Sequence, residues 1–375
     1  MSKRQSLNIL LHIQNKRPKK IIFIIIVLLV ASIGTYLLIG SHAASLYSSI
    51  NPVNGTLTGN ATILQTCAGS TSGSCVVFRS GVPLGLYSGP ANVSSLNNFS
   101  TWLGAPITYV TDYVDYKNGW SVDFNPTWIF NTWGPWVKAN SGRRLVLGLP
   151  MLENSNPEQF SQGTAGAFDA YFLSLSQKLV SNNMGNTIIR LGYEANNPNI
   201  GPWEACADPS GYIADWRHIV NVMKSVPGQN FEFDWNPTES SACGNQPLNS
   251  FASFYPGDDV VNIIGLDQYD IKWMDTTSTP QQRWQFFLNQ PMGLLDHKNF
   301  AIAHKKMVSF PEWGLYASGD KYGGGGDDPY YIDQMHAWFT SNNTAYQSYF
   351  NLNWGGGILS NFLNGQARYK SDFGP

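Results

Sequence analysis

The chain has 375 residues, of which 43% are hydrophobic and 13% are charged, and its formal net charge is −2. This composition excludes a largely disordered chain and allows one barrel-sized domain or two average domains. Every Asp and Glu lies at or after Asp112, whereas six Lys and Arg lie in the first 20 residues. Without those six, 17 of the 23 basic residues remain, compared with 25 acidic residues. The body is therefore acidic and has no electrostatic reason to bind nucleic acid.

The amino-terminal segment has the pattern of a membrane-targeting element. A basic stretch precedes 20 uncharged residues, Ile21 to Gly40, which as a helix could cross about 30 Å of hydrocarbon. Because basic flanks stay inside, we expect residues 1–20 to be a cytoplasmic tail and the body to be extracytoplasmic. Two outcomes stay open: a retained signal anchor in the cell membrane, or cleavage after Ala43 of "SHA" and secretion.

All four cysteines follow this segment, as disulfides in an oxidising compartment would require. Of the three possible pairings, we predict Cys67–Cys75, which closes a short turn, and Cys206–Cys243, which ties two neighbouring loops of the barrel described below. The absence of C-x-x-C and of suitable His spacing argues against a metal site. We expect no metal and no organic cofactor.

Residues 41–81 are rich in Gly, Ser, Thr and Asn, with short alternating apolar runs, which predicts a stalk or a small β segment. From Val82 onward, short apolar strands alternate with helical patterns. The eight predicted strands cover residues 82–88, 107–114, 143–152, 187–194, 230–237, 260–270, 306–314 and 346–354.

Eight strand–helix units over residues 82–375 predict an α/β fold, a (β/α)8 TIM barrel, in number and in size. A doubly wound open sheet is the alternative. It would more naturally stop at five or six strands, and the first turn, "LYSGPANV", lacks the G-x-G-x-x-G dinucleotide pattern.

A barrel of this kind carries its active site at the carboxyl ends of its strands. Glu194 ends the fourth predicted strand and Glu312 lies near the end of the seventh, so the two carboxyls should face each other across the mouth. Glycosidic bonds are broken by such a pair, and a separation of about 5–5.5 Å would allow double displacement. We therefore predict Glu194 and Glu312 as catalytic residues, with Glu194 kept protonated by apolar surroundings and by the charge of Glu312.

Aromatic residues make up 14% of the chain, which includes 13 Trp. Most must belong to the core, but aromatic rings also stack on the apolar faces of sugars. The predicted substrate-binding residues are Tyr269, Trp203, Trp313, Trp354, Asn196, Arg190 and Asp112. For the three Trp, core packing is the alternative; Arg190 is interpreted as a positioning residue.

The chain from about Val82 onward resembles clan A glycoside hydrolases, and within them the family 26 mannanase-like enzymes. The resemblance is carried by "IIRLGYEANNPNIGPW", "YIADWRHIVNVMKSVPGQNFEFDWNP", "YPGDDVVNIIGLDQYD", "FPEWGL" and "DDPYYIDQMHAWF". It implies Glu194 as acid/base, Glu312 as nucleophile, Tyr269 as a hydrogen-bond donor to that nucleophile, and retention of configuration. Tyr193 departs from the pattern, since well-studied mannanases carry His there.

These features predict a monomeric, retaining endo-β-glycosidase of a β-linked polysaccharide, with β-mannan as the first choice and β-glucan or β-1,3-xylan as alternatives. A non-catalytic glycan-binding protein and a structural surface protein on the same barrel are the rival hypotheses. The stretch "YGGGGDD" from Tyr322 has no following Gly-Lys-Ser/Thr, so a flexible lid is favoured over a phosphate loop.

Overall fold

The structure, a computed structural model, describes residues 61–64, 75–78, 81–153, 159–239, 243, 248, 250–319, 322–354 and 356–375. The predicted tail, the predicted membrane segment and Cys67 lie outside these ranges, as do all of residues 1–56. Among the residues that are described, no helix has the length and apolar character needed to span a membrane. In the predicted β segment, β1 (Ala61–Leu64) and β2 (Cys75–Phe78) form an antiparallel pair.

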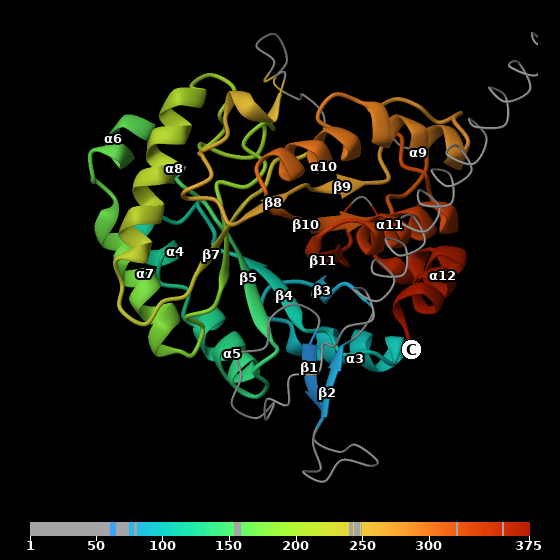
Figure 1. Ribbon diagram of the computed structural model, residues 1–375, viewed down its shortest axis with the longest axis horizontal. Helices are drawn as coiled ribbons and strands as arrows, with labels where there is room; N and C mark the ends of the chain where they lie inside the picture. The colour runs from blue at the N-terminus through green and yellow to red at the C-terminus, as the bar shows by residue number, and fades with distance from the viewer. Residues whose placement is uncertain are drawn as a thin grey trace, which may run out of the picture. The chain divides into compact units, whose positions relative to one another are not determined.

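Within the described ranges, eight parallel strand positions close into a barrel, which confirms the predicted (β/α)8 fold (Figure 1). The order is β3 to β8 in sequence, then β10 and β11, and β11 pairs with both β10 and β3. The sixth predicted strand is split into β8 and β9. The bounds are β3 (Leu84–Tyr87), β4 (Tyr109–Tyr113), β5 (Arg144–Leu149), β6 (Ile188–Leu191), β7 (Glu232–Trp235), β8 (Ile263–Gly265), β9 (Gln268–Tyr269), β10 (Met307–Gly314) and β11 (Thr344–Phe350).

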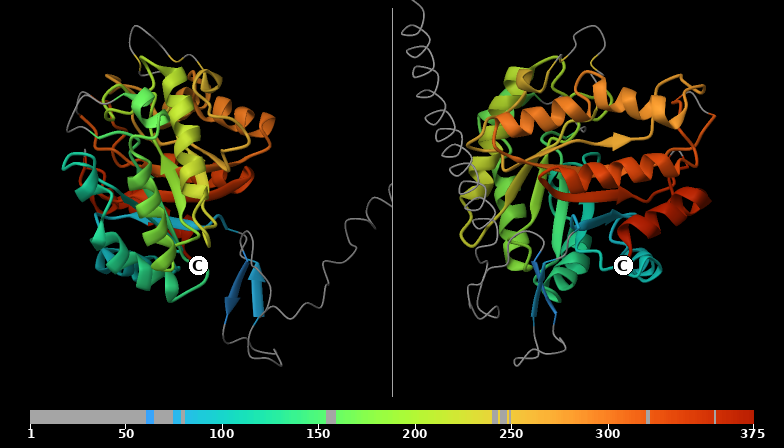
Figure 2. Two further views of the ribbon diagram at one scale, coloured as in Figure 1. Left: turned by 90° about the vertical axis from the view of Figure 1, so that its left-hand side faces the viewer. Right: turned by 45° about the vertical axis from the view of Figure 1, so that its right-hand side comes forward.

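Helices lie on the outside of the strands, as two further views of the barrel show (Figure 2). Several begin with an oxygen that accepts from the first-turn N–H groups, for example Asp208 of α8 and Asp328 of α11. The helices are α3 (Val93–Leu103), α4 (Trp120–Asp123), α5 (Thr127–Lys138), α6 (Phe160–Thr164), α7 (Asp169–Ser181), α8 (Pro209–Lys224), α9 (Pro280–Asn289), α10 (Leu294–Ala303), α11 (Pro329–Ser341) and α12 (Leu363–Phe373), with single 3-10 turns η2 (Phe251–Ser253) and η3 (Leu359–Asn361).

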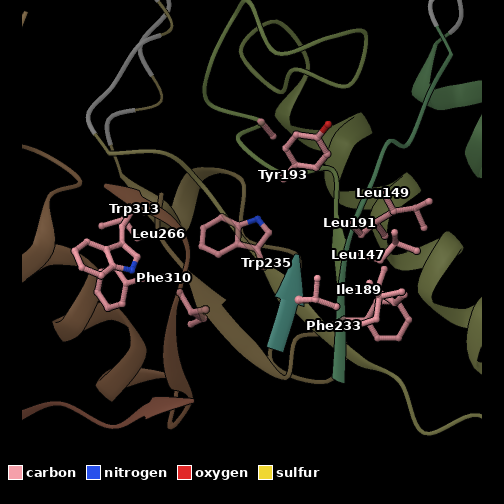
Figure 3. Close-up of a cluster of buried hydrophobic side chains, with 14 of the residues drawn as sticks. Leu147, Leu149, Ile189, Leu191, Tyr193, Phe233, Trp235, Leu266, Phe310 and Trp313 are labelled. Atoms are coloured by element: carbon pink, nitrogen blue, oxygen red, sulfur yellow. The ribbon is translucent and has the colours of Figure 1, made fainter. Parts of the chain in front are cut away.

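The main hydrophobic core lies between the strands and the surrounding helices (Figure 3). Alternate residues of each strand point outward into it, because successive side chains of a strand face opposite sides. Outward-facing members include Leu147 and Leu149 of β5, Ile189 and Leu191 of β6, and Phe233 and Trp235 of β7.

The barrel interior is apolar at one level and polar above it. A small cluster of Val146, Ile188, Ile263 and Tyr346 fills the lower level. Asp234 of β7 accepts hydrogen bonds from the hydroxyls of Ser309 and Tyr346, each 2.6 Å long. This interior carboxylate therefore finds hydroxyl partners on β10 and β11, which lowers the cost of its burial.

Candidate active site

Glu312 lies at the carboxyl end of β10, where its carboxylate accepts three hydrogen bonds. Its Oε1 accepts from the hydroxyl of Tyr113 at 2.7 Å and from Nη2 of Arg190 at 2.9 Å, and its Oε2 accepts from the hydroxyl of Tyr269 at 2.8 Å. Burial, followed by the charge of Glu312, raises the pKa of both tyrosines well above the ordinary value, so their hydroxyls stay protonated donors. Three donors thus hold Glu312 as an oriented anion.

An irregularity in β10 turns Glu312 toward the mouth. Between Phe310 and Trp313, β10 advances three residues while β11 advances only two, from Gln347 to Tyr349. Regular alternation would send Glu312 outward with Phe310 and would send Trp313 inward. The extra residue reverses this, so Phe310 and Trp313 both join the outer core and Glu312 reaches Tyr269.

Glu194 lies just after β6, in a turn rather than in the strand. Its backbone has a φ of 51°, in the left-handed region that residues other than glycine seldom adopt. The turn is held in place because the N–H of Glu194 donates to the carbonyl of Asn236 at 2.6 Å, and because the hydroxyl of Tyr212 donates to the carbonyl of Gly192 at 3.1 Å. Such strain persists only where its surroundings determine it, which is common at functional sites.

The environment of Glu194 favours its protonated form. Burial, and next the negative charge of Glu312, raise the pKa of Glu194 to about 7. The Nδ2 of Asn197 donates to Oε2 of Glu194 at 3.1 Å and works in the opposite direction. The two glutamates therefore share one electrostatic site, in which Glu312 is an anion and Glu194 can carry a proton at neutral pH.

Arg190 of β6 is fully buried beneath the glutamates and positions Glu312. Its Nη2 also pairs with Oδ2 of Asp267 at 2.8 Å, and its Nε donates to Oδ1 of Asn236 at 2.8 Å. Its guanidinium lies over the ring of Tyr193, 5.3 Å from the centroid. Arg190 is thus completely occupied by protein groups, which places it as a positioning residue behind the nucleophile candidate.

Asp267 is a second buried carboxylate next to Arg190. Burial is the main cause that raises its pKa well above the ordinary value, and the charges of Glu312 and Glu194 add to this effect. The guanidinium of Arg190 opposes the shift. One cation therefore lies among three carboxyls, and this shortage of positive charge helps keep a proton in the site.

Among the predicted sugar platforms, only Trp354 has a ring open to solvent, with 48% of the residue exposed. It follows β11 and contacts the ring of Tyr269 at a centroid distance of 5.3 Å. Because Tyr269 donates to Glu312, Trp354 lies one ring away from the nucleophile candidate. Its role as a platform stays a prediction.

The predictions for Trp203 and Trp313 as platforms are wrong, because both are fully buried. The Nε1 of Trp203 donates to the carbonyl of Tyr193 at 2.9 Å, and the ring packs beneath the turn that carries Glu194. Trp313 stacks on Tyr369 of α12, with centroids 5.9 Å apart. Each is a packing residue of the core, the alternative considered from the sequence.

Asn196 and Asp112 also fail as substrate-binding residues, since both are buried and bonded within the protein. Asn196 exchanges two hydrogen bonds with the backbone of Thr238, at 2.8 and 2.9 Å. Asp112 accepts from Nε1 of Trp133 at 2.6 Å and from the N–H of Ala91 at 2.9 Å. Asn196 ties two loops together, and Asp112 fastens the loop after β3 to α5.

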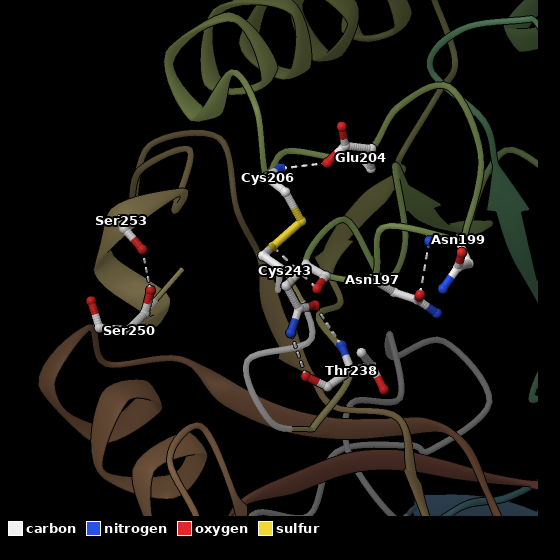
Figure 4. The surroundings of a disulfide bond; sticks show 9 residues. Asn197, Asn199, Glu204, Cys206, Thr238, Cys243, Ser250 and Ser253 are labelled. Carbon is white, nitrogen blue, oxygen red and sulfur yellow. Dashed lines mark hydrogen bonds between the residues drawn. A yellow bond between two sulfur atoms is a disulfide. The ribbon is translucent and has the colours of Figure 1, made fainter. Parts of the chain in front are cut away.

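The predicted disulfide between Cys206 and Cys243 is present (Figure 4). It joins the loop after β6 to the loop after β7, with Cα atoms 5.4 Å apart, and so acts beside the Asn196 link. Figure 4 also shows Asn197, the partner of Glu194, near the bridge. The other predicted pairing involves Cys67, which lies outside the described residues.

Tyr113 is a site residue that the sequence analysis missed. It follows Asp112 in β4, and alternation of side chains decides between the two. Thr111 faces the interior, where its hydroxyl donates to that of Ser348 at 2.8 Å, and Tyr113 faces the same way. Asp112 faces the helices with Val110. Counting alternate positions along β4 would have identified Tyr113.

Within the described ranges, no group of three His, Cys, Asp or Glu side chains is arranged to hold a metal ion. The site as described works with carboxyl, guanidinium, hydroxyl and amide groups.

Comparison with solved structures identifies the class of fold. The chain shares its fold with the catalytic domain of a family 26 endo-β-1,4-mannanase from Bacillus sp. JAMB-750, at a TM-score of 0.54 and 16% identity over 79% of this chain and 87% of that one. A modular endo-β-1,4-mannanase from Cellulomonas fimi gives a TM-score of 0.55 and 16% identity, over 79% of this chain and 71% of that one.

The family 26 domain of an endo-β-mannanase/endo-β-glucanase from Prevotella bryantii gives a TM-score of 0.52 and 15% identity, over 79% of this chain and 89% of that one. A comparison with models of protein families finds no match, and neither does a comparison with curated protein sequences. The chain has a barrel similar to that of the family 26 glycoside hydrolases, as its motifs had suggested.

Proposed function

We propose that the protein is a retaining endo-β-glycosidase that hydrolyses a β-linked polysaccharide by double displacement. The observation that carries the proposal is that two carboxyls of one site have surroundings that favour opposite protonation states. Glu312 accepts three hydrogen bonds that suit an anion, whereas the pKa of Glu194 is raised to about 7. Glycoside hydrolysis with retention requires one nucleophilic carboxylate and one carboxylic acid.

In the first step, Glu312 attacks the anomeric carbon while Glu194 donates its proton to the departing glycosidic oxygen, which gives a covalent glycosyl ester. In the second step, Glu194 takes a proton from water, the water oxygen attacks the same carbon, and the ester bond to Glu312 breaks. Arg190, Tyr113 and Tyr269 hold the attacking carboxylate in place. For this chemistry we expect the two carboxyl groups to lie about 5–5.5 Å apart.

The substrate that we propose is a β-mannan. This choice is supported by the printed names of similar structures, among them endo-β-1,4-mannanases. The similar Prevotella bryantii domain comes from an endo-β-mannanase/endo-β-glucanase, so β-glucan is the next candidate. We also propose that the enzyme works outside the cytoplasm, which the disulfide between Cys206 and Cys243 supports.

The decisive experiment incubates the protein with mannan, lichenan, xylan and laminarin and identifies the released sugars. We expect internal cleavage of one of them, with the β-anomer as the first product in an NMR time course. Glu312→Ala should lower hydrolysis by at least about 10⁴-fold while binding persists, because only the nucleophile is lost. A protein that binds glycan but releases no sugar from any of the four would instead be a lectin.

A further inference from the structure

A row of aromatic rings runs from Glu312 to a loop that the catalytic proposal does not use. Successive ring centroids lie 5.3, 5.1, 5.8 and 4.9 Å apart, so every ring contacts the next. We call this set the aromatic row, and its members in order are Tyr269, Trp354, Tyr316, Tyr322 and Trp273.

The row is buried at some members and open at others. Tyr269 and Tyr316 are buried, whereas Trp354 is 48% exposed and Trp273 is 65% exposed. A tryptophan that exposes two thirds of its surface loses the free energy that burial would give. Trp273 is also connected, through successive ring contacts, to Tyr269, which donates to Glu312. Its exposure is therefore better explained by a ligand that reaches the site than by packing.

The loop that carries Trp273 has a defined conformation. Asp275 accepts from the N–H groups of Thr277 and Ser278 at 2.9 and 3.0 Å, and it forms an ion pair with Lys272. The exposed Met274 has a φ of 59°, in the left-handed region. A strained turn fixed by several bonds to one carboxylate presents Trp273 at low entropic cost to a ligand.

The glycine-rich stretch after β10 places Tyr322 against Trp273. The N–H of Lys272 donates to the carbonyl of Gly323 at 3.0 Å, and the N–H of Gly325 donates to the carbonyl of Asp270 at 3.1 Å. A Cβ atom at Gly323 would lie only 2.1 Å from the carbonyl oxygen of Lys272. These glycines therefore allow close backbone contact between two loops. The flexible lid expected from the sequence stays a prediction.

We infer that Trp273 and Tyr322 form a distal sugar-binding subsite, which holds a pyranose ring of the same β-linked chain whose scissile bond lies at Glu312. The inference rests on the proposed function for its ligand class. Pyranose rings have apolar C–H faces, which aromatic rings bind, and hydroxyl edges that remain in water. A half-open ring pair on a rigid loop suits such a ligand, and ring contacts through Tyr316 and Trp354 connect this pair to Tyr269, the donor to Glu312.

The test compares the binding of short and long chains to the full protein carrying Glu194→Gln, which should make turnover slow enough for binding to be measured. Calorimetry would measure Kd for the di- and hexasaccharides of β-1,4-linked mannose, glucose and galactose. We expect Trp273→Ala to lower the affinity ratio of hexasaccharide to disaccharide by about tenfold, since a removed tryptophan platform commonly has an effect of this size. Tyr322→Ala should lower the same ratio, because it supports the Trp273 ring.

Trp128→Ala is the matched control, because Trp128 of α5 is an exposed tryptophan outside the row, at 38% exposure. It should leave the ratio unchanged. An unchanged ratio for Trp273→Ala, with hydrolysis by the parent protein intact, would overturn the subsite alone. A lowered ratio in a protein that hydrolyses no polysaccharide would keep the subsite and reject the enzyme. Absence of binding to all three hexasaccharides would overturn the subsite as well.

Discussion

Two glutamates of the same chemical type acquire different properties because their immediate contacts differ. Glu312 receives hydrogen bonds from Tyr113, Arg190 and Tyr269. Glu194 has an amide donor, Asn197, and lies in the field of Glu312. At the scale of single residues, these contacts favour an anion at Glu312 and a protonated acid at Glu194.

The pH dependence of activity tests this separation. Because Glu194 must be protonated to act as a general acid, kcat/KM should fall about tenfold per pH unit once the pH exceeds its pKa of about 7. Glu194→Gln should remove this alkaline limb and leave a low rate that does not change with pH there. Polysaccharide hydrolysis measured from pH 5 to pH 9 gives both profiles.

Glu232→Gln serves as the control for that measurement, because Glu232 pairs with Arg144 and lies outside the site. Its profile should match that of the parent. An alkaline limb that persists in Glu194→Gln would assign the proton to another group, and Asp267 would be the first to examine.

At the scale of elements, two links fasten the loop that carries Glu194 to the loop after β7. One is the Cys206–Cys243 disulfide and the other is the pair of hydrogen bonds between Asn196 and Thr238. Together they limit the ways in which the strained turn at Glu194 can relax. Loop position, rather than strand position, therefore determines where the acid lies.

Removal of the disulfide should affect both stability and activity. The bridge closes a loop with a sequence separation of 37 residues, so the double variant Cys206→Ala/Cys243→Ala should lose about 2–4 kcal/mol of unfolding free energy. Urea unfolding measures this loss, and kcat/KM should fall as well because Glu194 becomes less well placed. A variant with the parent's stability but reduced kcat/KM would show that the bridge acts on the loop alone.

At the scale of the whole molecule, one buried acid outside the candidate site should set part of the pH dependence of stability. Asp215 of α8 is fully buried against Gly163 of α6, and neither of its carboxyl oxygens has a hydrogen-bond partner among the described residues. Burial, and next the charge of Asp169, raise its pKa to about 8. An unfolded aspartate titrates near 3.9, so the folded state holds the extra proton between these values.

Stability should therefore decrease as the pH rises from about 4 to about 8, because the unfolded state has released this proton in that range whereas the folded state still binds it. Asp215 alone accounts for a slope of up to about 1.4 kcal/mol per pH unit. Asp215→Asn should lack this contribution and gain stability over the parent at pH 8 but not at pH 4, as urea unfolding would show. The control is Asp208→Asn on the same helix, since Asn caps a helix as well as Asp. Equal slopes for parent and Asp215→Asn would contradict the prediction.

The sequence predicted the barrel and the positions of both glutamates, because strand–helix alternation and polar strand ends are local patterns. It did not predict which way neighbouring side chains face. Trp313 was misplaced because an extra residue in β10 reverses the alternation, and Asp112 because a polar side chain can bond to the surrounding helices. Asn196 was misread because its partner, the backbone of Thr238, is distant in sequence.

Because of the extra residue between Phe310 and Trp313, the direction in which Glu312 points depends on the number of residues in β10 relative to β11. Adding one residue to β11 between Gln347 and Tyr349 would restore an ordinary ladder, and regular alternation would then turn Trp313 toward the opening and Glu312 away from it. Engineers could graft new loops around the rim to change what is recognised. They would have to leave this short stretch of β10 unchanged, because its one extra residue relative to β11 is what turns Glu312 toward the mouth.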